Sequence, residues 1–212
     1  MQKIRYMRLA LLADEKQYAE LMKFGCSPQL EIIRIPVPAI VEEADIYVDL
    51  LFDNSPDRVR SWSLIGAPVL FINAVEFRVD IKDQPIILIN GWPGFLEREI
   101  LEAGGRPEQK EIAEKLAGLL NRKLEWVKPV PGLVSARVIS MIINEAYFTI
   151  GEEVTDETSV DTAMKLGTNY PYGPFEWAEK IGHTKINTLL KLLAEENARY
   201  QPAELLTRRA GS

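Results

Sequence analysis

The chain is poor in the residues that build redox, metal and proton-transfer sites. Its 212 residues include a single cysteine, Cys26, and a single histidine, His183. One cysteine cannot form an intrachain disulfide, which favours a reducing, cytoplasmic location. One cysteine and one histidine cannot supply the ligands of a Cys/His zinc cluster, so we expect no metal site. No run of about 18 or more apolar residues occurs, so the sequence predicts no contact with a membrane interior.

Positive charge is also in short supply. The chain has 25 Lys and Arg against 31 Asp and Glu, a net charge of −6. Proteins that bind nucleic acid or anionic membranes present a basic face, so this balance disfavours both kinds of partner. With 47% hydrophobic and 26% charged residues, the composition is that of a globular protein with one large domain or two small ones.

In the first half of the chain, short apolar runs alternate with helical patterns. The apolar runs lack clean alternation, which is typical of parallel strands buried on both faces by helices. We therefore predict an α/β domain with a shortened, Rossmann-like parallel sheet over residues 1–128. The predicted strands are 8–12, 30–35, 45–52, 68–72, 85–89 and 124–127, and the predicted helices are 15–24 and 107–121.

The second half, residues 129–212, begins at the hinge-like Pro129-Val-Pro-Gly132 and contains only helical patterns, which predicts an all-α domain. Apolar residues cover most of the circumference of the predicted helix 133–150. Its narrow polar stripe contains Arg137, Ser140 and Asn144. Such a helix usually lies at the centre of a bundle or in an oligomer interface.

Three further helices are predicted from their end signals. Thr155 is a suitable N-cap for a helix that ends at Gly167, where a left-handed residue would fit. Pro174 suits the first position of the next helix, and residues 186–193 carry the apolar stripe of the last.

Several phrases in this second half resemble the C-terminal helical domain of the 3-hydroxyacyl-CoA dehydrogenases. They are Asp161-Thr-Ala-Met, Tyr170-Pro-Tyr-Gly-Pro174, Pro131-Gly-Leu-Val and Asn144-Glu-Ala. The resemblance implies that this domain forms a homodimer and one wall of an acyl-CoA cleft. It also implies that the first domain binds NAD and that the protein acts in fatty-acid metabolism.

The expected dinucleotide motif is missing from the first domain. The family's Gly-x-Gly-x-x-Gly turn corresponds to Leu12-Ala-Asp-Glu-Lys-Gln-Tyr18, and no glycine occurs before Phe24. Asp14 and Glu15 are good helix-starting residues, but they would repel the two phosphates. No carboxylate for the ribose follows the second strand, so we expect no cofactor.

The residues expected to carry the chemistry are also altered. By the resemblance, Asn90 takes the place of the catalytic histidine, and Glu102 that of the glutamate that orients it. A carboxamide cannot accept a proton near neutral pH. Glu102 alone fits an ordinary solvated helix residue better than a catalytic one.

The polar contacts to substrate are only partly retained. By the resemblance, Ala136 replaces a substrate-binding asparagine and the neighbouring Ser135 is a partial substitute. Asn73, after the fourth predicted strand, is kept.

Three hypotheses follow from these substitutions. In the first, the protein is a dimeric, non-catalytic relative that binds an acyl-CoA or a paralogous dehydrogenase. In the second, it is an active 3-hydroxyacyl-CoA dehydrogenase with an atypical cofactor loop and a substitute base. In the third, it is a purely structural dimer without a ligand. Losing three catalytic features together favours the first hypothesis.

Overall fold

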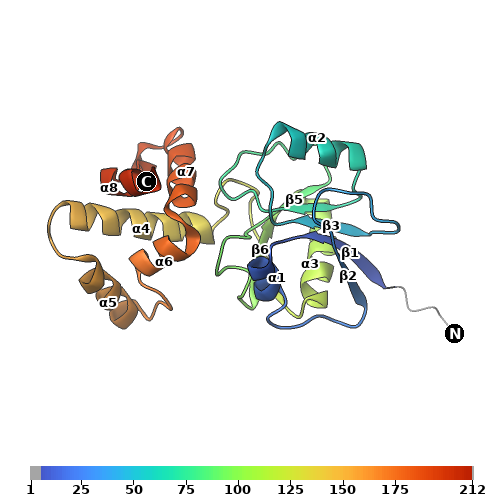
Figure 1. Ribbon diagram of the computed structural model, residues 1–212, viewed down its shortest axis with the longest axis horizontal. Helices are drawn as coiled ribbons and strands as arrows, with labels where there is room; N and C mark the ends of the chain where they lie inside the picture. Colours follow the sequence, from blue (N-terminus) through green and yellow to red (C-terminus); the bar gives the residue numbers. More distant parts are fainter. Residues whose placement is uncertain (1–5, 212) are drawn as a thin grey trace. The chain divides into compact units, whose positions relative to one another are not determined.

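The computed structural model describes residues 6–211. The chain divides into two compact units, the first ending at Leu133 and the second beginning at Val134 (Figure 1). The boundary expected from the sequence lies slightly earlier, after Lys128. The two units are described separately below.

The first unit is built around a seven-stranded sheet, counted over the described residues, with the order β2-β1-β3-β4-β5-β6-β7. All neighbouring strands are parallel except β5 and β6, which are antiparallel. The order runs outward from β1 in both directions, so the Rossmann-like fold predicted from the sequence is confirmed. The strands are β1 (Met7–Leu12), β2 (Leu30–Arg34), β3 (Ile46–Asp49), β4 (Leu70–Ile72), β5 (Ile86–Ile89), β6 (Ile100–Gly104) and β7 (Lys123–Trp126).

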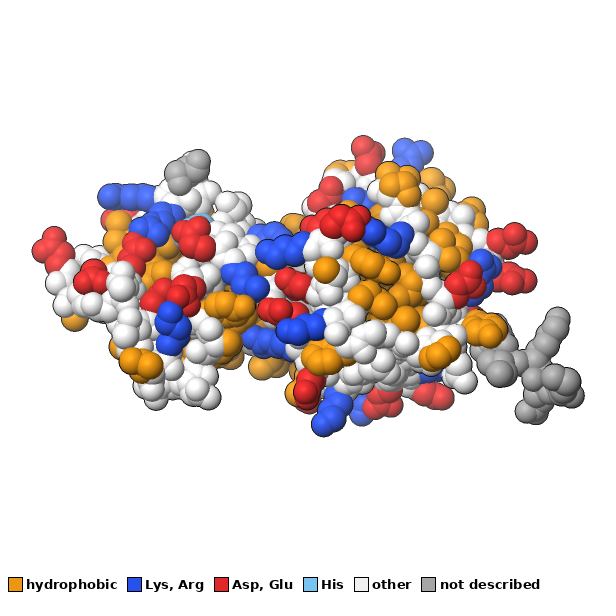
Figure 2. Space-filling model, turned by 60° about the horizontal axis from the view of Figure 1, so that its bottom comes forward, with side chains coloured by type: hydrophobic (Ala, Val, Ile, Leu, Met, Phe, Trp, Pro, Cys, Tyr) orange, Lys and Arg blue, Asp and Glu red, His pale blue; other side chains and the backbone are white. Residues whose placement is uncertain are grey.

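Helices cover both faces of this sheet (Figure 1). Leu9 and Leu11 of β1 belong to the apolar cluster that packs against α1 (Glu15–Leu21) and α3 (Lys110–Leu119), the latter preceded by a short 3₁₀ turn, η1 (Pro107–Gln109). The alternate residues of β1 belong to the cluster on the other face, with Trp62 of α2 (Pro56–Ile65). Acidic and basic side chains are interspersed over the face of this unit visible in Figure 2.

Two elements of the first unit were not predicted. Strand β6 contains Glu102, so the interpretation of Glu102 as a helix residue is wrong. Helix α2 carries clear end signals: Ser55 accepts the Arg58 N–H at 3.3 Å, and Gly66 ends the helix with a φ of 61°. These signals were present in the sequence, but α2 has few apolar residues and therefore no strong stripe.

The second unit is all helical, as the sequence predicts. Its elements are α4 (Ser135–Gly151), α5 (Glu157–Thr168), α6 (Pro174–Ile181), α7 (His183–Ala194), a 3₁₀ turn η2 (Ala198–Tyr200) and α8 (Glu204–Ala210). Within residues 6–211, no helix has both the length and the apolar character needed to cross a bilayer.

The polar stripe of α4 points inward, not outward. Ser140 and Asn144 are buried, and the Asn144 amide donates to Gln201 O at 2.9 Å and accepts the Ala203 N–H at 2.8 Å. Asn144 therefore ties the segment before α8 to the central helix. The consequence is that part of the apolar circumference of α4 is left exposed.

Two predicted helix ends are wrong by one or two residues. Asp156, not Thr155, caps α5, because its carboxylate accepts the Ser159 N–H at 2.9 Å. The left-handed residue at the end of α5 is Asn169, with a φ of 56°, not Gly167.

Candidate functional site

Ligands of doubly wound sheets bind beyond the carboxyl ends of the parallel strands. In the first unit this edge brings together the β1–α1 turn and the segments that follow β3, β4 and β5. Asn73 and Asn90, two of the site residues predicted from the sequence, lie there. Among the described residues, no group of three or more His, Cys, Asp or Glu side chains is placed to hold a metal ion.

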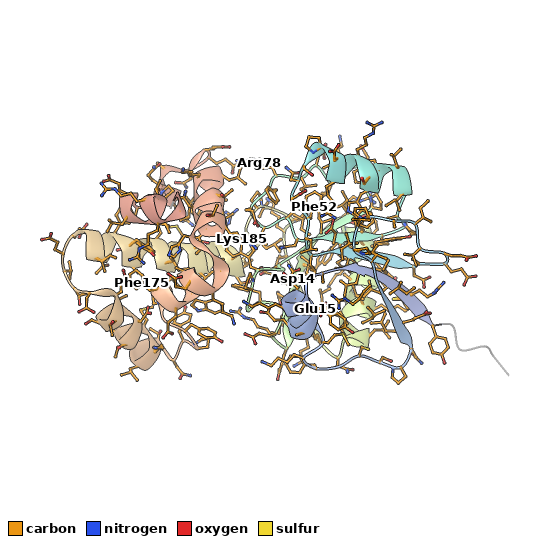
Figure 3. The ribbon with its side chains drawn as sticks, in the orientation of Figure 1. Asp14, Glu15, Phe52, Arg78, Phe175 and Lys185 are labelled. Atoms are coloured by element: carbon orange, nitrogen blue, oxygen red, sulfur yellow. The ribbon has the colours of Figure 1, made fainter. Side chains whose placement is uncertain are left out.

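The N-terminus of α1 is closed by the chain itself. The Asp14 carboxylate accepts the Gln17 N–H at 2.7 Å, and the Gln17 side chain accepts the Asp14 N–H at 3.1 Å. These reciprocal bonds form a capping box, which satisfies backbone donors that would otherwise be free at a helix start. Figure 3 shows Asp14 with Glu15 at the beginning of this helix.

Glu15 is held by an arginine from the neighbouring strand. Arg34, the last residue of β2, forms an ion pair with Glu15 at 2.8 Å and donates to Ala13 O at 3.3 Å. The hydrogen bond from Arg34 holds the pKa of Glu15 below its ordinary value. The turn therefore keeps its second carboxylate ionised as well.

Two buried amides converge on the backbone after β3. Gln17 donates to Leu50 O at 2.9 Å, and Asn73 donates to the same oxygen at 3.3 Å. The role of Gln17 could not be predicted from the sequence, because a polar residue in a first helical turn is usually solvated. Both amides are committed to holding the backbone.

Asn73 also holds the loop after β5. Its Oδ1 accepts the Gly91 N–H at 3.0 Å, and a Cβ at Gly91 would lie 2.8 Å from Asn73 Cγ. Residue 91 must therefore be glycine, because the Asn73 side chain leaves no room for a Cβ atom there. Both polar ends of the Asn73 side chain are bonded within the protein.

Asn90 and Glu102, two further predicted site residues, lie opposite each other on neighbouring segments. Residue 90 follows β5 and residue 102 lies in β6, and the backbone N–H of Asn90 donates to Glu102 O at 3.1 Å. The Asn90 amide makes a long hydrogen bond of 3.4 Å to the Glu102 carboxylate, across a separation of 12 residues. Asn90 Oδ1 accepts the Trp92 N–H at 3.2 Å. The pair has a donor and a carboxylate, but no imidazole.

A buried tryptophan follows this pair, and its role was not predicted. Trp92 is fully buried, and its indole N–H donates to Glu76 at 2.9 Å. The next glycine, Gly94, donates its N–H to the Glu20 carboxylate at 2.9 Å. These bonds fix the Gly91–Gly94 loop to the sheet edge and to α1.

The remaining predicted site residues, Ser135 and Ala136, belong to the second unit. They are the first two residues of α4, where Ala136 is fully buried and Ser135 is half-buried. The Ala136 methyl group has no hydrogen-bonding capacity, so the side chain at this position can make no polar contact.

Comparison with known proteins identifies the family. A probable 3-hydroxybutyryl-CoA dehydrogenase of Bacillus subtilis is 34% identical over 199 residues, which cover 82% of this chain and 68% of the relative. The chain belongs to the 3-hydroxyacyl-CoA dehydrogenase family. The family model for the C-terminal domain of 3-hydroxyacyl-CoA dehydrogenase matches residues 132–211.

Other relatives match over a smaller part of their length. The 3-hydroxyadipyl-CoA dehydrogenase of Escherichia coli is 44% identical over 82 residues, 38% of this chain and 17% of that protein. A 3-hydroxybutyryl-CoA dehydrogenase of Bradyrhizobium diazoefficiens matches over 34% of its length at 30% identity, covering 46% of this chain. In both, the match covers far less than two thirds of the relative.

Solved structures show that the fold is kept. The (S)-3-hydroxybutyryl-CoA dehydrogenase PaaH1 of Ralstonia eutropha superposes with a TM-score of 0.74 at 17% identity, covering 96% of this chain and 93% of that one. FadB2 of Mycobacterium tuberculosis gives a TM-score of 0.75 at 12% identity with the same coverages.

The β1–α1 turn of this family member does not fit a dinucleotide. A pyrophosphate at the start of α1 would have to displace the Asp14 carboxylate from the Gln17 N–H and then lie beside it and Glu15. Phosphate binding at a helix start needs free backbone donors and an uncompensated positive end of the dipole. Here the protein supplies its own anion at that place.

Proposed function

We propose that this protein is a dimeric, non-catalytic relative of the 3-hydroxyacyl-CoA dehydrogenases. The observation that carries the proposal is the Asn90–Glu102 pair, which by the family resemblance stands in the place of a base and its supporting carboxylate. Glu102 supplies a carboxylate within hydrogen-bonding distance, but the Asn90 carboxamide cannot take up a proton. Loss of a general base alone costs about 10²- to 10⁴-fold in rate.

The β1–α1 turn supports the same proposal independently. Hydride transfer needs a bound dinucleotide, and the capping box at Asp14 occupies two of the backbone donors that its phosphates would need and adds a carboxylate beside them. A substitute base would therefore not restore activity by itself. The alternative, an active dehydrogenase with an atypical cofactor loop, is supported by the family membership and by the retained fold.

Homodimer formation through the second unit is supported by the exposed side of α4. Val134 immediately precedes α4, Val138 lies about one turn further along and Phe148 about four turns, and the three side chains are 52%, 51% and 40% exposed. Residues at this spacing share one stripe of a helix, and monomeric proteins seldom leave such apolar stripes in water. A second copy of the helix would cover it.

For the ligand or partner, the proposal is an acyl-CoA thioester or a paralogous dehydrogenase. The relatives' names specify 3-hydroxybutyryl-CoA and 3-hydroxyadipyl-CoA dehydrogenases, which gives acyl-CoA esters as the ligands to test first. A ligand at 100 times its dissociation constant adds about 2.7 kcal/mol to the free energy of unfolding. Thermal unfolding with acyl-CoA esters of increasing chain length should therefore show a clear shift for the preferred ester.

Catalysis is tested by NAD⁺-dependent oxidation of (S)-3-hydroxybutyryl-CoA. The wild-type protein and Asn90→His are assayed beside the Bacillus subtilis relative as the positive control. We expect no turnover from either form of this protein, because the variant regains a base but not a phosphate site. Turnover by the wild type would contradict the proposal, and turnover by the variant alone would contradict the exclusion of the dinucleotide.

A further inference from the structure

The connection from β4 to β5 is unusual for a parallel pair of strands. Residues 73–85 join the two strands, and they contain turns but no helix. Parallel crossovers usually place a helix on the sheet face. On this face the helix is α2, from the previous connection, so the sheet beside it is covered only by an extended loop.

A pocket of about 320 Å³ lies where that cover is thin. Its buried walls are apolar side chains of the segment after β3, of α2, of the α2–β4 connection and of β4, namely Phe52, Trp62, Ala67, Leu70 and Ile72. The volume is at the lower end of the range for small-molecule sites and far too small for a helix or strand of a partner.

The aromatic walls present carbon surface to the pocket. The Trp62 indole N–H is already bonded to Asp49 at 2.8 Å, and the Phe52 ring packs edge-on against Phe77 with centroids 6.2 Å apart. No polar atom of these two rings is left to bind a ligand. Burial of an apolar molecule there is favoured by about 25 cal/mol for each Å² removed from water.

The mouth of the pocket is polar and its charges are balanced. Arg78 and Asp80 contribute opposite charges, and Asn54, Ser63 and Gln84 contribute uncharged hydrogen-bonding groups. One carboxylate oxygen of Asp80 already accepts a hydrogen bond from the Lys82 N–H at 3.0 Å. Phe52 in the wall and Arg78 at the mouth are labelled in Figure 3. An anionic ligand would meet Asp80 and a cationic one Arg78, so the mouth favours neither sign.

We propose that this pocket binds an uncharged amphiphile, a hydrocarbon body with one hydroxyl or amide end at the mouth. The apolar walls take the hydrocarbon, and the neutral side chains at the mouth take the polar end. The pocket lies within the first unit, and its lining includes no residue of the β1–α1 turn and neither Asn90 nor Glu102.

The test uses the full chain and the neutral fluorescent probe N-phenyl-1-naphthylamine. Ser63 is an exposed α2 residue that lines the pocket, so Ser63→Trp should block the mouth and weaken probe binding at least about tenfold. Leu64→Trp is the matched control, because Leu64 is the next residue of α2, is 76% exposed and lies outside the pocket lining. Circular dichroism confirms that both variants are folded.

Competition then tests the ligand class. We expect 1-decanol to displace the probe at lower concentration than decanoate. Better displacement by decanoate would overturn the assignment of a neutral ligand. Equal saturable binding of the probe to the wild type and to Ser63→Trp would show that the probe binds elsewhere. No saturable binding of the probe to the wild type would likewise overturn the pocket as a binding site.

Discussion

Replacing Gly91 by alanine tests whether the sheet edge is a closed network of the protein's own polar groups. The new Cβ would lie 2.8 Å from Asn73 Cγ and 3.0 Å from Asn73 Cβ. Asn73 cannot turn away freely, because its two polar ends hold the Gly91 N–H and Leu50 O. The clash must therefore break at least one of these bonds or shift the loop that begins at Gly91.

The expected cost follows from two contributions. Over-packing a well-packed interior costs about 1–3 kcal/mol, and a lost hydrogen bond adds about 1 kcal/mol. Gly91→Ala should therefore lower the free energy of unfolding by about 2–4 kcal/mol, which is a large part of the stability of an ordinary domain.

Urea unfolding followed by tryptophan fluorescence measures this change, since Trp62, Trp92 and Trp126 all lie in the first unit. Gly118→Ala is the control: a Cβ there meets no atom within 4 Å, and alanine in a helix is favoured over glycine by about 0.5–1 kcal/mol. We expect opposite shifts of the urea midpoint for the two variants. A Gly91→Ala midpoint equal to or above that of the wild type would refute the closed network.

Three further predictions concern packing, pH and assembly. Asn144→Ala should cost about 2–4 kcal/mol in urea unfolding, because it leaves the buried Ala203 N–H and the partly buried Gln201 O unpaired. The exposed Glu145→Ala should change stability by less than about 0.5 kcal/mol, and equal effects of the two variants would contradict the role of Asn144. Burial raises the pKa of Asp49 above its ordinary value of 3.8, so the folded state binds this proton more tightly. The unfolding free energy of the wild type should therefore fall, relative to Asp49→Asn, as pH rises through this raised pKa, and a flat difference would refute the shift. Val138→Asp should give a monomeric mass by light scattering, whereas Glu145→Gln should stay dimeric; a monomeric wild type would remove the proposed dimer.

Most of the fold could be predicted from sequence patterns, and the misses have physical reasons. The apolar runs of β1 to β5 and the start signal at Pro174 located those elements within a few residues. Strand β6 was missed because it contains Glu102 and ends in glycines, features that disfavour a strand in isolation. Its antiparallel pairing with β5 supplies the stability that its own residues do not.

The candidate site could be predicted in position but not in its bonding. The spacing between residues 90 and 102 indicated that they belong together, and the hydrogen bond between them shows that they do. Nothing in the sequence indicated that Gln17 and Asn73 share Leu50 O, because contacts between distant segments depend on strand register. The inward direction of Asn144 was missed for a related reason. A polar stripe on a helix predicts a solvent-facing side, unless the buried backbone groups that bond to its side chains are known.

The most direct test is the titration of NADH into this protein, followed by the quenching of its tryptophan fluorescence. The Bacillus subtilis relative is titrated in parallel to set the concentration range. Because Asp14 fills the start of α1 and Glu15 stays ionised beside it, we predict no saturable quenching at concentrations that saturate the relative. Saturable binding in that range, abolished when excess NAD⁺ is added, would contradict a turn that excludes the dinucleotide and with it the non-catalytic role.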